Sequence, residues 1–286
     1  SNSATFALNN FAESLGSISG GGTISLGSAT LTSTTTANTT FSGDITGTGG
    51  LVKAGSGTLT LSGSNSYSGT TAVNAGGVVV GDNNAFGSGV VSLADGTTLS
   101  SDASARTLSN NMNIRRIAFE GTGALTLNGN LTNNRGAAIT VTNSVAGGLT
   151  MSNLALSHTT TDRDVTLAGS GNTTINGVIS DGAVGATDSK FIIDNTGTTT
   201  LNGANTFSGG LTLSAGTLVI GNNAALGSGA VTFDDGVTVN SDATARNVAN
   251  DIDFRNLQIG GTGALTLSGT LTHTRAGGST LTNNNA

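Results

Sequence analysis

A gap-free internal repeat constrains the fold of this chain more than any other feature. Residues 61–146 align with residues 201–286 when the sequence is shifted by 140 positions. A weaker correspondence continues upstream, which places the two repeats at about 39–146 and 173–286. The clearest landmarks are SDASAR (101–106) against SDATAR (241–246) and the heptapeptide GTGALTL at 121–127 and 261–267. Self-similarity at a fixed offset is the signature of a repeat architecture.

The differences between the two copies indicate which positions are buried. Many apolar residues of the first copy face a different apolar residue in the second, so polarity is kept while side-chain shape changes. We expect these positions to form the core. They are Val73, Val78, Val80, Phe86, Leu93, Leu99, Leu108, Met112, Ile114, Ile117, Phe119 and Val141, paired with Leu213, Leu218, Ile220, Leu226, Phe233, Val239, Val248, Ile252, Phe254, Leu257, Ile259 and Leu281.

Short strands recur within the long repeat. Apolar segments with strand-type alternation follow one another at intervals of about 19 to 22 residues, and Gly, Asn, Ser and Asp fill the gaps as turn residues. One set lies at 58–61, 77–80, 97–99, 117–119 and 139–141, and a second set includes 71–73 and 90–93. No helical periodicity of 3.6 residues is present.

The chain of 286 residues contains no proline, whereas typical usage of about 5% would give about 14. Proline cannot donate a ladder hydrogen bond, so its absence favours continuous sheet with few edges. An antiparallel sandwich or barrel would explain the short strands but not the gap-free repeat. The sequence therefore predicts one continuous parallel β-solenoid over residues 1–286, with about 13 or 14 turns.

The segment GGLVKAGSGTLTLSGSNSYSGTTAVNAGGVVVG at 49–81 resembles the passenger-associated transport repeat of bacterial autotransporters, and 192–221 shows the same pattern more weakly. The resemblance implies a right-handed parallel β-helix displayed outside a Gram-negative cell after export through a C-terminal membrane barrel. The absence of cysteine fits that route. No such barrel and no capping sequence follow Ala286, so we expect either a segment of a longer passenger or a unit that stacks end to end.

Composition argues against several classes of function. A net charge of −6 and a pI near 4.6 disfavour nucleic acid as a partner. No run of 18 apolar residues predicts a transmembrane helix. The N-terminal sequence SNSATFALNN is not a signal peptide, so an export signal is expected to lie elsewhere.

Few residues have the pattern of a catalytic or metal site. We expect Asp95 and Asp235, each followed by glycine, to stabilise turns by local hydrogen bonds. The charge cluster at 162–164 beside His158 predicts a solvated turn, and His158 and His273 lack partners for zinc. We expect no catalytic residue, no metal and no cofactor.

Two other features are candidates for a functional surface. The recurring pairs Asp102/Arg106 and Asp242/Arg246 predict ion pairs that fix loops, with carbohydrate binding as an alternative. Outward threonines on stacked turns are expected to form polar ladders around Thr58, Thr60, Thr126 and Thr266. Such ladders favour solubility or adhesion, and the T-x-T spacing is too irregular along the sequence to favour ice binding.

These observations predict a non-enzymatic, extracellular stalk or adhesive segment at the bacterial outer-membrane surface. The expected partners are other copies of the chain, meeting laterally or end to end, or ligands such as cell-surface glycans. Two alternatives stay open: a filament subunit that stacks end to end, and a polysaccharide-active enzyme on a β-helix.

Overall fold

The computed structural model describes residues 4–182, 188–274 and 277–285. Over these residues the chain is all-β, with parallel strands stacked in about 14 turns. The predicted β-solenoid is thereby confirmed. No helix occurs among the described residues.

The chain divides into two compact units, which are described separately. Unit 1 comprises residues 1–130 and 144–147, and unit 2 comprises residues 131–143 and 148–286. The prediction of one continuous solenoid over 1–286 stays a prediction. The strands of unit 1 are β1 (Thr5–Ala7), β2 (Glu13–Leu15), β3 (Thr23–Ser25), β4 (Leu31–Ser33), β5 (Thr39–Phe41), β6 (Asp44–Thr46), β7 (Leu51–Lys53), β8 (Thr58–Leu61), β9 (Thr71–Val73), β10 (Gly77–Val80), β11 (Val91–Leu93), β12 (Thr97–Ser101), β13 (Arg106–Leu108), β14 (Met112–Ile114), β15 (Ile117–Gly121) and β16 (Leu125–Leu127).

Unit 2 holds the remaining strands. They are β17 (Leu131–Asn133), β18 (Ile139–Asn143), β19 (Leu149–Met151), β20 (Leu154–Ser157), β21 (Val165–Gly169), β22 (Thr173–Ile175), β23 (Ile179–Gly182), β24 (Phe191–Leu201), β25 (Leu211–Ile220), β26 (Val231–Phe233), β27 (Val237–Ser241), β28 (Arg246–Val248), β29 (Ile252–Phe254), β30 (Leu257–Gly261), β31 (Leu265–Leu267), β32 (Leu271–Thr272) and β33 (Leu281–Asn283).

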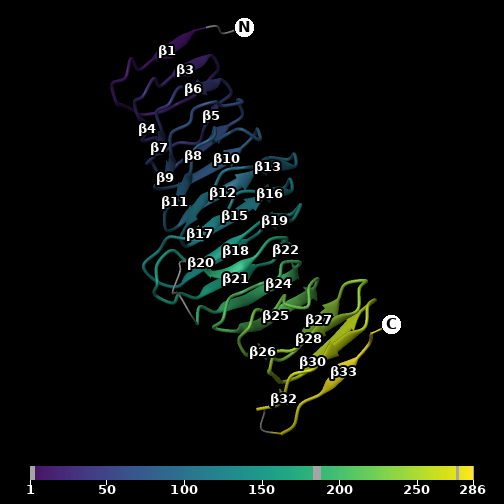
Figure 1. Ribbon diagram of the computed structural model, residues 1–286. Helices are drawn as coiled ribbons and strands as arrows, with labels where there is room; N and C mark the ends of the chain where they lie inside the picture. The colour runs from purple at the N-terminus through teal and green to yellow at the C-terminus, as the bar shows by residue number, and fades with distance from the viewer. Residues whose placement is uncertain (1–3, 183–187, 275–276, 286) are drawn as a thin grey trace. The chain divides into compact units, whose positions relative to one another are not determined.

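Regular stacking in unit 1 follows from the even spacing of its strands. Strands β4, β7, β9 and β11 lie one above the next in Figure 1, and each pairs in parallel with its neighbour, as in Leu31↔Leu51 and Leu51↔Thr71. Strands β8, β10, β12 and β15 form a second parallel series. Alternate residues point inward, which gives the buried–half-buried–buried pattern of β9 and β11.

Unit 2 contains longer turns and longer strands. Ile139 pairs with Val165, and Val165 pairs with Phe191, so both of these turns are longer than the turn from Phe191 to its partner Leu211. Strand β24 is 11 residues long. Its pairing with β25 shifts register on both sides of Asp194. Upstream of residues 181–190 the offset between the two repeats falls from 140 to 134 residues, so the sequence places about six extra residues in this loop. Residues 183–187 of the loop lie outside the described residues.

The predicted core positions are buried in both copies, with two exceptions. Phe254 on β29 is half-buried, and Leu281 on β33 is 45% exposed. Strand β33 pairs only with β30 among the described residues, so no further turn covers Leu281. The aliphatic interior is otherwise closed by large side chains, of which Tyr67, Phe119 and Phe207 are fully buried.

Asparagine has a second role that the sequence reading missed. Asn65 is 4% exposed, and its Oδ1 accepts from the backbone N of Ile45 at 2.8 Å while its Nδ2 donates to the carbonyl of Ala85 at 2.6 Å. Asn205 bonds in the same way to Ile179 and Ala225 at 2.8 and 2.6 Å. These asparagines join three successive turns from inside the solenoid, where turn or surface positions were expected.

Lys53 is a fully buried cation in unit 1, although its counterpart in the second repeat is Ile193. Its Nζ donates to the carbonyl oxygens of Gly55 and Ala75. Burial lowers the pKa of the Lys53 ammonium because the charged form loses hydration.

We predict that the buried lysine makes stability rise with pH. Between the lowered folded pKa of Lys53 and its unfolded value, the unfolded chain binds more protons, so the free energy of unfolding increases as pH rises through that window. Chemical denaturation of wild type and Lys53→Met at pH 7, 8.5 and 10 tests this. The wild type is expected to gain stability relative to the variant as pH rises, and parallel pH profiles would contradict the prediction.

Candidate functional site

The two predicted charge pairs form bidentate contacts in equivalent loops. In unit 1, Arg106 donates from Nε to Asp102 Oδ1 at 2.8 Å and from Nη2 to Oδ2 at 2.5 Å. In unit 2, Arg246 bonds to Asp242 in the same way at 2.9 and 2.5 Å. Each aspartate also accepts a backbone N–H two residues further on, at 3.0 Å. The pairs therefore close the loops before β13 and β28, and both carboxylate oxygens of each aspartate are used within the loop.

These contacts affect the ionisation of both carboxyl groups. The hydrogen bonds from Arg106 hold the pKa of Asp102 below its usual value, and those from Arg246 do the same for Asp242. The side chains of Asp102 and Asp242 are 32% and 31% exposed, so solvent screens the ion pairs.

We predict a small, pH-dependent effect of removing either charge. Asp102→Asn is expected to cost about 1 kcal/mol or less at pH 7. Because the folded pKa is lowered, this contribution is present above the usual carboxyl pKa and is lost as pH falls through the lowered value. Urea unfolding over a series of decreasing pH values measures it, with Asp242→Asn as the matched variant. A difference between wild type and variant that does not shrink as the pH falls would show that the ion pair is not its source.

Other acidic residues join successive turns. Asp95 accepts from the backbone N of Arg116 at 3.1 Å and pairs with its guanidinium at 3.3 Å. In unit 2 the ion pair is between Asp234 and Arg255 at 3.0 Å, one residue earlier in each turn. Asp235 accepts from Asn256. The turns expected at Asp95 and Asp235 are present, with positive φ at Gly96 and Gly236, and both carboxylates also bond to the next turn.

Each of the four predicted threonines lies beside a residue of a neighbouring turn. Thr58 lies beside Gly77, and Thr60 lies between Thr40 and Val79. Thr126 lies beside Thr107, and Thr266 beside Asn247. Thr60 and Thr126 therefore each stack on a threonine of a neighbouring turn, whereas Thr58 and Thr266 stack on glycine and asparagine.

Unit 2 holds longer polar columns that spacing along the sequence did not reveal. One column stacks Thr198, Thr217, Thr238 and Gln258 on successive turns. A neighbouring column stacks Thr150, Thr174 and Thr200, and continues with Val219 and Asn240. Turn length varies along the unit, which obscured this alignment in the sequence.

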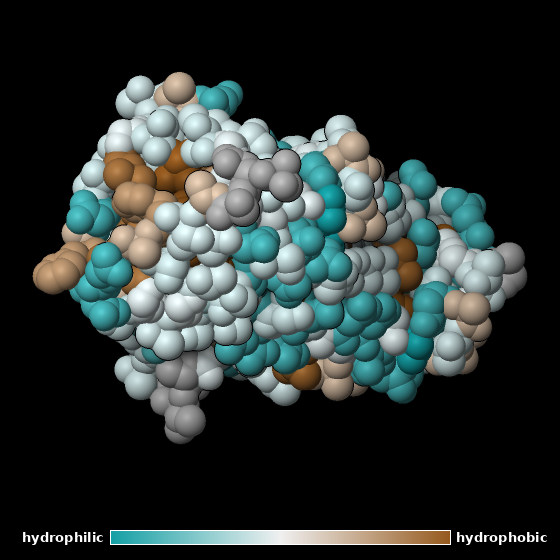
Figure 2. Space-filling model, turned by 90° about the horizontal axis from the view of Figure 1, so that it is seen from above, coloured by the Kyte–Doolittle hydropathy of each residue, from teal (hydrophilic) through white to brown (hydrophobic). Residues whose placement is uncertain are grey.

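Most of the face in Figure 2 is hydrophilic or neutral, with small, separated hydrophobic areas.

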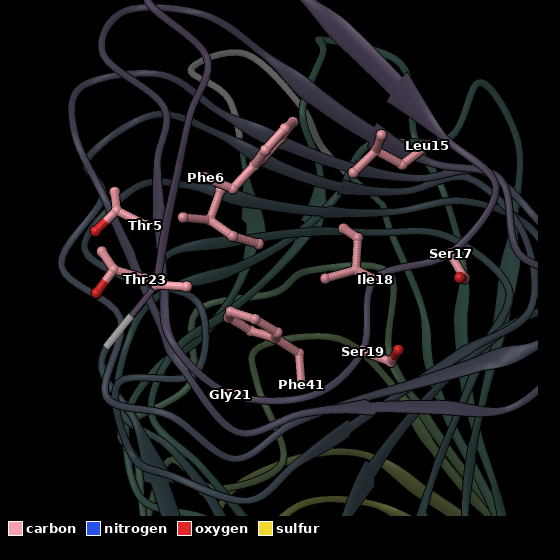
Figure 3. Close-up of a pocket in the computed structure, with 11 residues that line it drawn as sticks. Thr5, Phe6, Leu15, Ser17, Ile18, Ser19, Gly21, Thr23 and Phe41 are labelled. Atoms are coloured by element: carbon pink, nitrogen blue, oxygen red, sulfur yellow. The ribbon is translucent and has the colours of Figure 1, made fainter. Parts of the chain in front are cut away.

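The first turns of unit 1 line an open cavity of about 290 Å³, formed by both apolar and hydroxyl side chains. Phe6, Ile18 and Phe41 project into it in Figure 3, with Thr5 and Thr23 to one side. Phe6 is 44% exposed, whereas Ile18 and Phe41 are buried. The described residues that line the cavity include no titratable side chain.

No cluster with the composition of a metal site occurs within residues 4–182, 188–274 and 277–285. The Nδ1 atom of His158 lies 2.9 Å from the carbonyl oxygen of Asn133. Over the same residues, no helix is long and apolar enough to cross a bilayer.

The arrangement defines a repeat protein of the β-solenoid class, whose outward surface is built from short polar columns and ion-paired turns. The family model of the passenger-associated-transport-repeat matches residues 51–80 and 194–220. The chain thus carries two passenger-associated transport repeats, one in each unit, and repeats of this family belong to autotransporter passengers, which are secreted to the cell surface. Comparison with curated proteins and with solved structures gives no match.

Proposed function

We propose that the chain is a non-enzymatic stalk or adhesive segment of an autotransporter-like surface protein, located at the outer-membrane surface. The observation that carries this proposal is the match of residues 51–80 and 194–220 to passenger-associated transport repeats on a parallel β-solenoid. Backbone ladders hold each turn in register, so side chains at defined positions form columns along a unit. Such columns supply many weak, repeated hydrogen bonds to a surface or glycan.

The distribution of charge supports a binding role over catalysis. Carboxylates of the turns pair with arginines, as in Asp102–Arg106 and Asp234–Arg255, and within the described part of the chain no group of three or more acidic or histidine side chains forms. Outward groups include the hydroxyls of the Thr198, Thr217 and Thr238 column. Hydroxyl and methyl groups at about 4.8 Å spacing favour contact with extended ligands.

Surface display tests this proposal. Residues 1–286 are placed between an export signal and the membrane barrel of an unrelated autotransporter, and whole cells are probed with antibody and external protease. We expect the segment outside the cell and increased attachment of the cells to glycan-coated surfaces. A chain that folds when purified but stays inside the cell would contradict the role as a surface stalk. A chain that is displayed but does not change attachment to any glycan or abiotic surface would contradict the adhesive role.

End-to-end association is a second candidate, favoured by exposed apolar groups at the first and last strands. Phe6 borders the open cavity of unit 1, while Leu271 and Leu281 of unit 2 are 43% and 45% exposed. Stacking of these surfaces between copies would be heterologous and would propagate into a filament. Electron microscopy over a concentration series separates the candidates: long fibres support stacking, and discrete particles at every concentration oppose it.

A further inference from the structure

Two loops of unit 2 lie one turn apart, because each follows one strand of the pair β17–β20 and leads into one strand of the pair β18–β21. Residues 158–164 connect β20 to β21, and residues 134–138 connect β17 to β18, whereas β11 and β12 of unit 1 are joined by residues 94–96 alone. The longer loop also lies outside both internal repeats, which end at about 146 and resume at about 173. Insertions that extend a solenoid on one side commonly form its binding face, because the regular turns hold them rigidly.

The two loops are held against each other by specific bonds. His158 Nδ1 is 2.9 Å from the carbonyl oxygen of Asn133, and Arg163 Nη1 donates to the carbonyl of Arg135 at 2.6 Å. Within the longer loop, Ser157 Oγ donates to the carbonyl of Thr161 at 2.8 Å. The loops therefore have a defined conformation, and the predicted solvated turn at 162–164 is wrong for its central residue.

Arg163 is buried, at 9% exposure, and is bonded unlike the arginines of the ion pairs. Its Nη2 donates to Thr159 Oγ1 at 3.1 Å, and its backbone N donates to Ser189 Oγ at 3.0 Å. Its Nε is buried without a hydrogen-bond partner, and none of the ion pairs described above includes it. By contrast, Asp102 saturates the same edge of Arg106 with two bonds.

A buried guanidinium donor without a partner is unfavourable, because the lost hydration is not replaced. The Nε and Nη atoms of arginine form a planar fork that matches the oxygens of carboxylate and sulfate. We propose that the two stacked loops, 134–138 and 158–164, bind an anionic group of an acidic polysaccharide, with Arg163 Nε donating to one of its oxygens. Because Nε is covered in the structure, ligand binding requires that some of the bonds that hold the 158–164 loop break.

This inference rests on the proposed adhesive function and names its ligand class. Acidic polysaccharides carry carboxylates, as in polyuronates, or sulfates, and both present the oxygens that the fork accepts. Direct binding of the purified chain to immobilised oligogalacturonate, sulfated heparin oligosaccharide and neutral dextran distinguishes the two sources. We expect binding to one or both acidic ligands, none to dextran, and weaker binding as sodium chloride increases.

Variants of two arginines provide the decisive comparison. Arg163→Gln is expected to weaken binding at least tenfold, and Arg163→Lys, which keeps the charge but loses the fork, is expected to weaken it less. Arg116→Gln is the control, because the side chain of Arg116 is 56% exposed and lies in a turn of unit 1. Thermal unfolding of each variant establishes that it is folded. Equal binding by Arg163→Gln and wild type would overturn the proposal.

If the variants fail to fold, thermal unfolding of the wild-type chain with and without ligand still tests the proposal. An acidic oligosaccharide must raise its melting temperature, and salt must reduce the increase. Absence of binding to both acidic polymers overturns the proposal, and so does binding of inorganic sulfate alone, because the ligand would then be a small ion. Displayed cells that attach to surfaces equally well with Arg163→Gln would retain the adhesive function while excluding this site.

Discussion

Asn65→Ala is expected to destabilise unit 1 locally by about 2–6 kcal/mol, because it leaves two buried backbone groups without partners, each costing about 1–3 kcal/mol. The two groups are the N–H of Ile45 and the carbonyl of Ala85, which Asn65 bridges at 2.8 and 2.6 Å. Water does not replace the lost bonds, since Asn65 is only 4% exposed. Amide hydrogen exchange at Ile45 measures the effect as a lower local opening free energy.

Asn205→Ala provides the matched test in unit 2, because Asn205 bridges Ile179 and Ala225 at the same distances. Exposed Asn74 is the control, and its replacement by alanine is expected to change stability by less than about 0.5 kcal/mol. Local exchange is preferred because it reports on the turn that contains the bridge, whereas a global unfolding curve averages over all turns. Equal, small effects of Asn65→Ala and Asn74→Ala would show that the buried bridge contributes little.

Tyr67 and Thr71 form a buried pair that the second repeat replaces with Phe207 and Leu211. The Tyr67 hydroxyl lies 2.5 Å from Thr71 Oγ1, and burial raises the pKa of the phenol well above its usual value. Tyr67→Phe leaves the Thr71 hydroxyl buried without its partner, and Thr71→Leu does the same to Tyr67. Each change is therefore expected to cost about 1–3 kcal/mol.

The double variant Tyr67→Phe/Thr71→Leu is expected to lose about 1–2 kcal/mol less stability than the two single variants lose in total, because both hydroxyls are then absent. Phe207→Tyr in unit 2 is the reverse test: it places a hydroxyl beside Leu211 and should destabilise. Phe207 also packs against Phe191 at a ring-centroid distance of 6.2 Å, a contact that the change keeps. Strictly additive single and double variants would exclude the proposed coupling.

The sequence determined the fold class and most of the core. Evenly spaced short strands, the absence of proline and the gap-free repeat together favour parallel stacking over an antiparallel sandwich or barrel. The exchange of one apolar residue for another between the two repeats predicted buried positions such as Val78/Leu218 and Leu99/Val239, because packing constrains volume and polarity together. The recurrence of the charges also placed the Asp102–Arg106 and Asp242–Arg246 pairs, whose partners lie within one loop.

Only the tertiary structure decided which polar residues face inward and which columns form. Asn65 and Lys53 resemble turn and surface residues in the sequence, and they are buried because neighbouring turns supply their hydrogen-bond partners. Thr198 and Thr217 align because a bulge in β24 sets their register, which local spacing does not encode. Arg163 is held by a loop one turn away through the carbonyl of Arg135. Strands form from local patterns in the chain. Contacts between turns depend on the length of every intervening loop, so only the stacked structure shows which side chains contact one another.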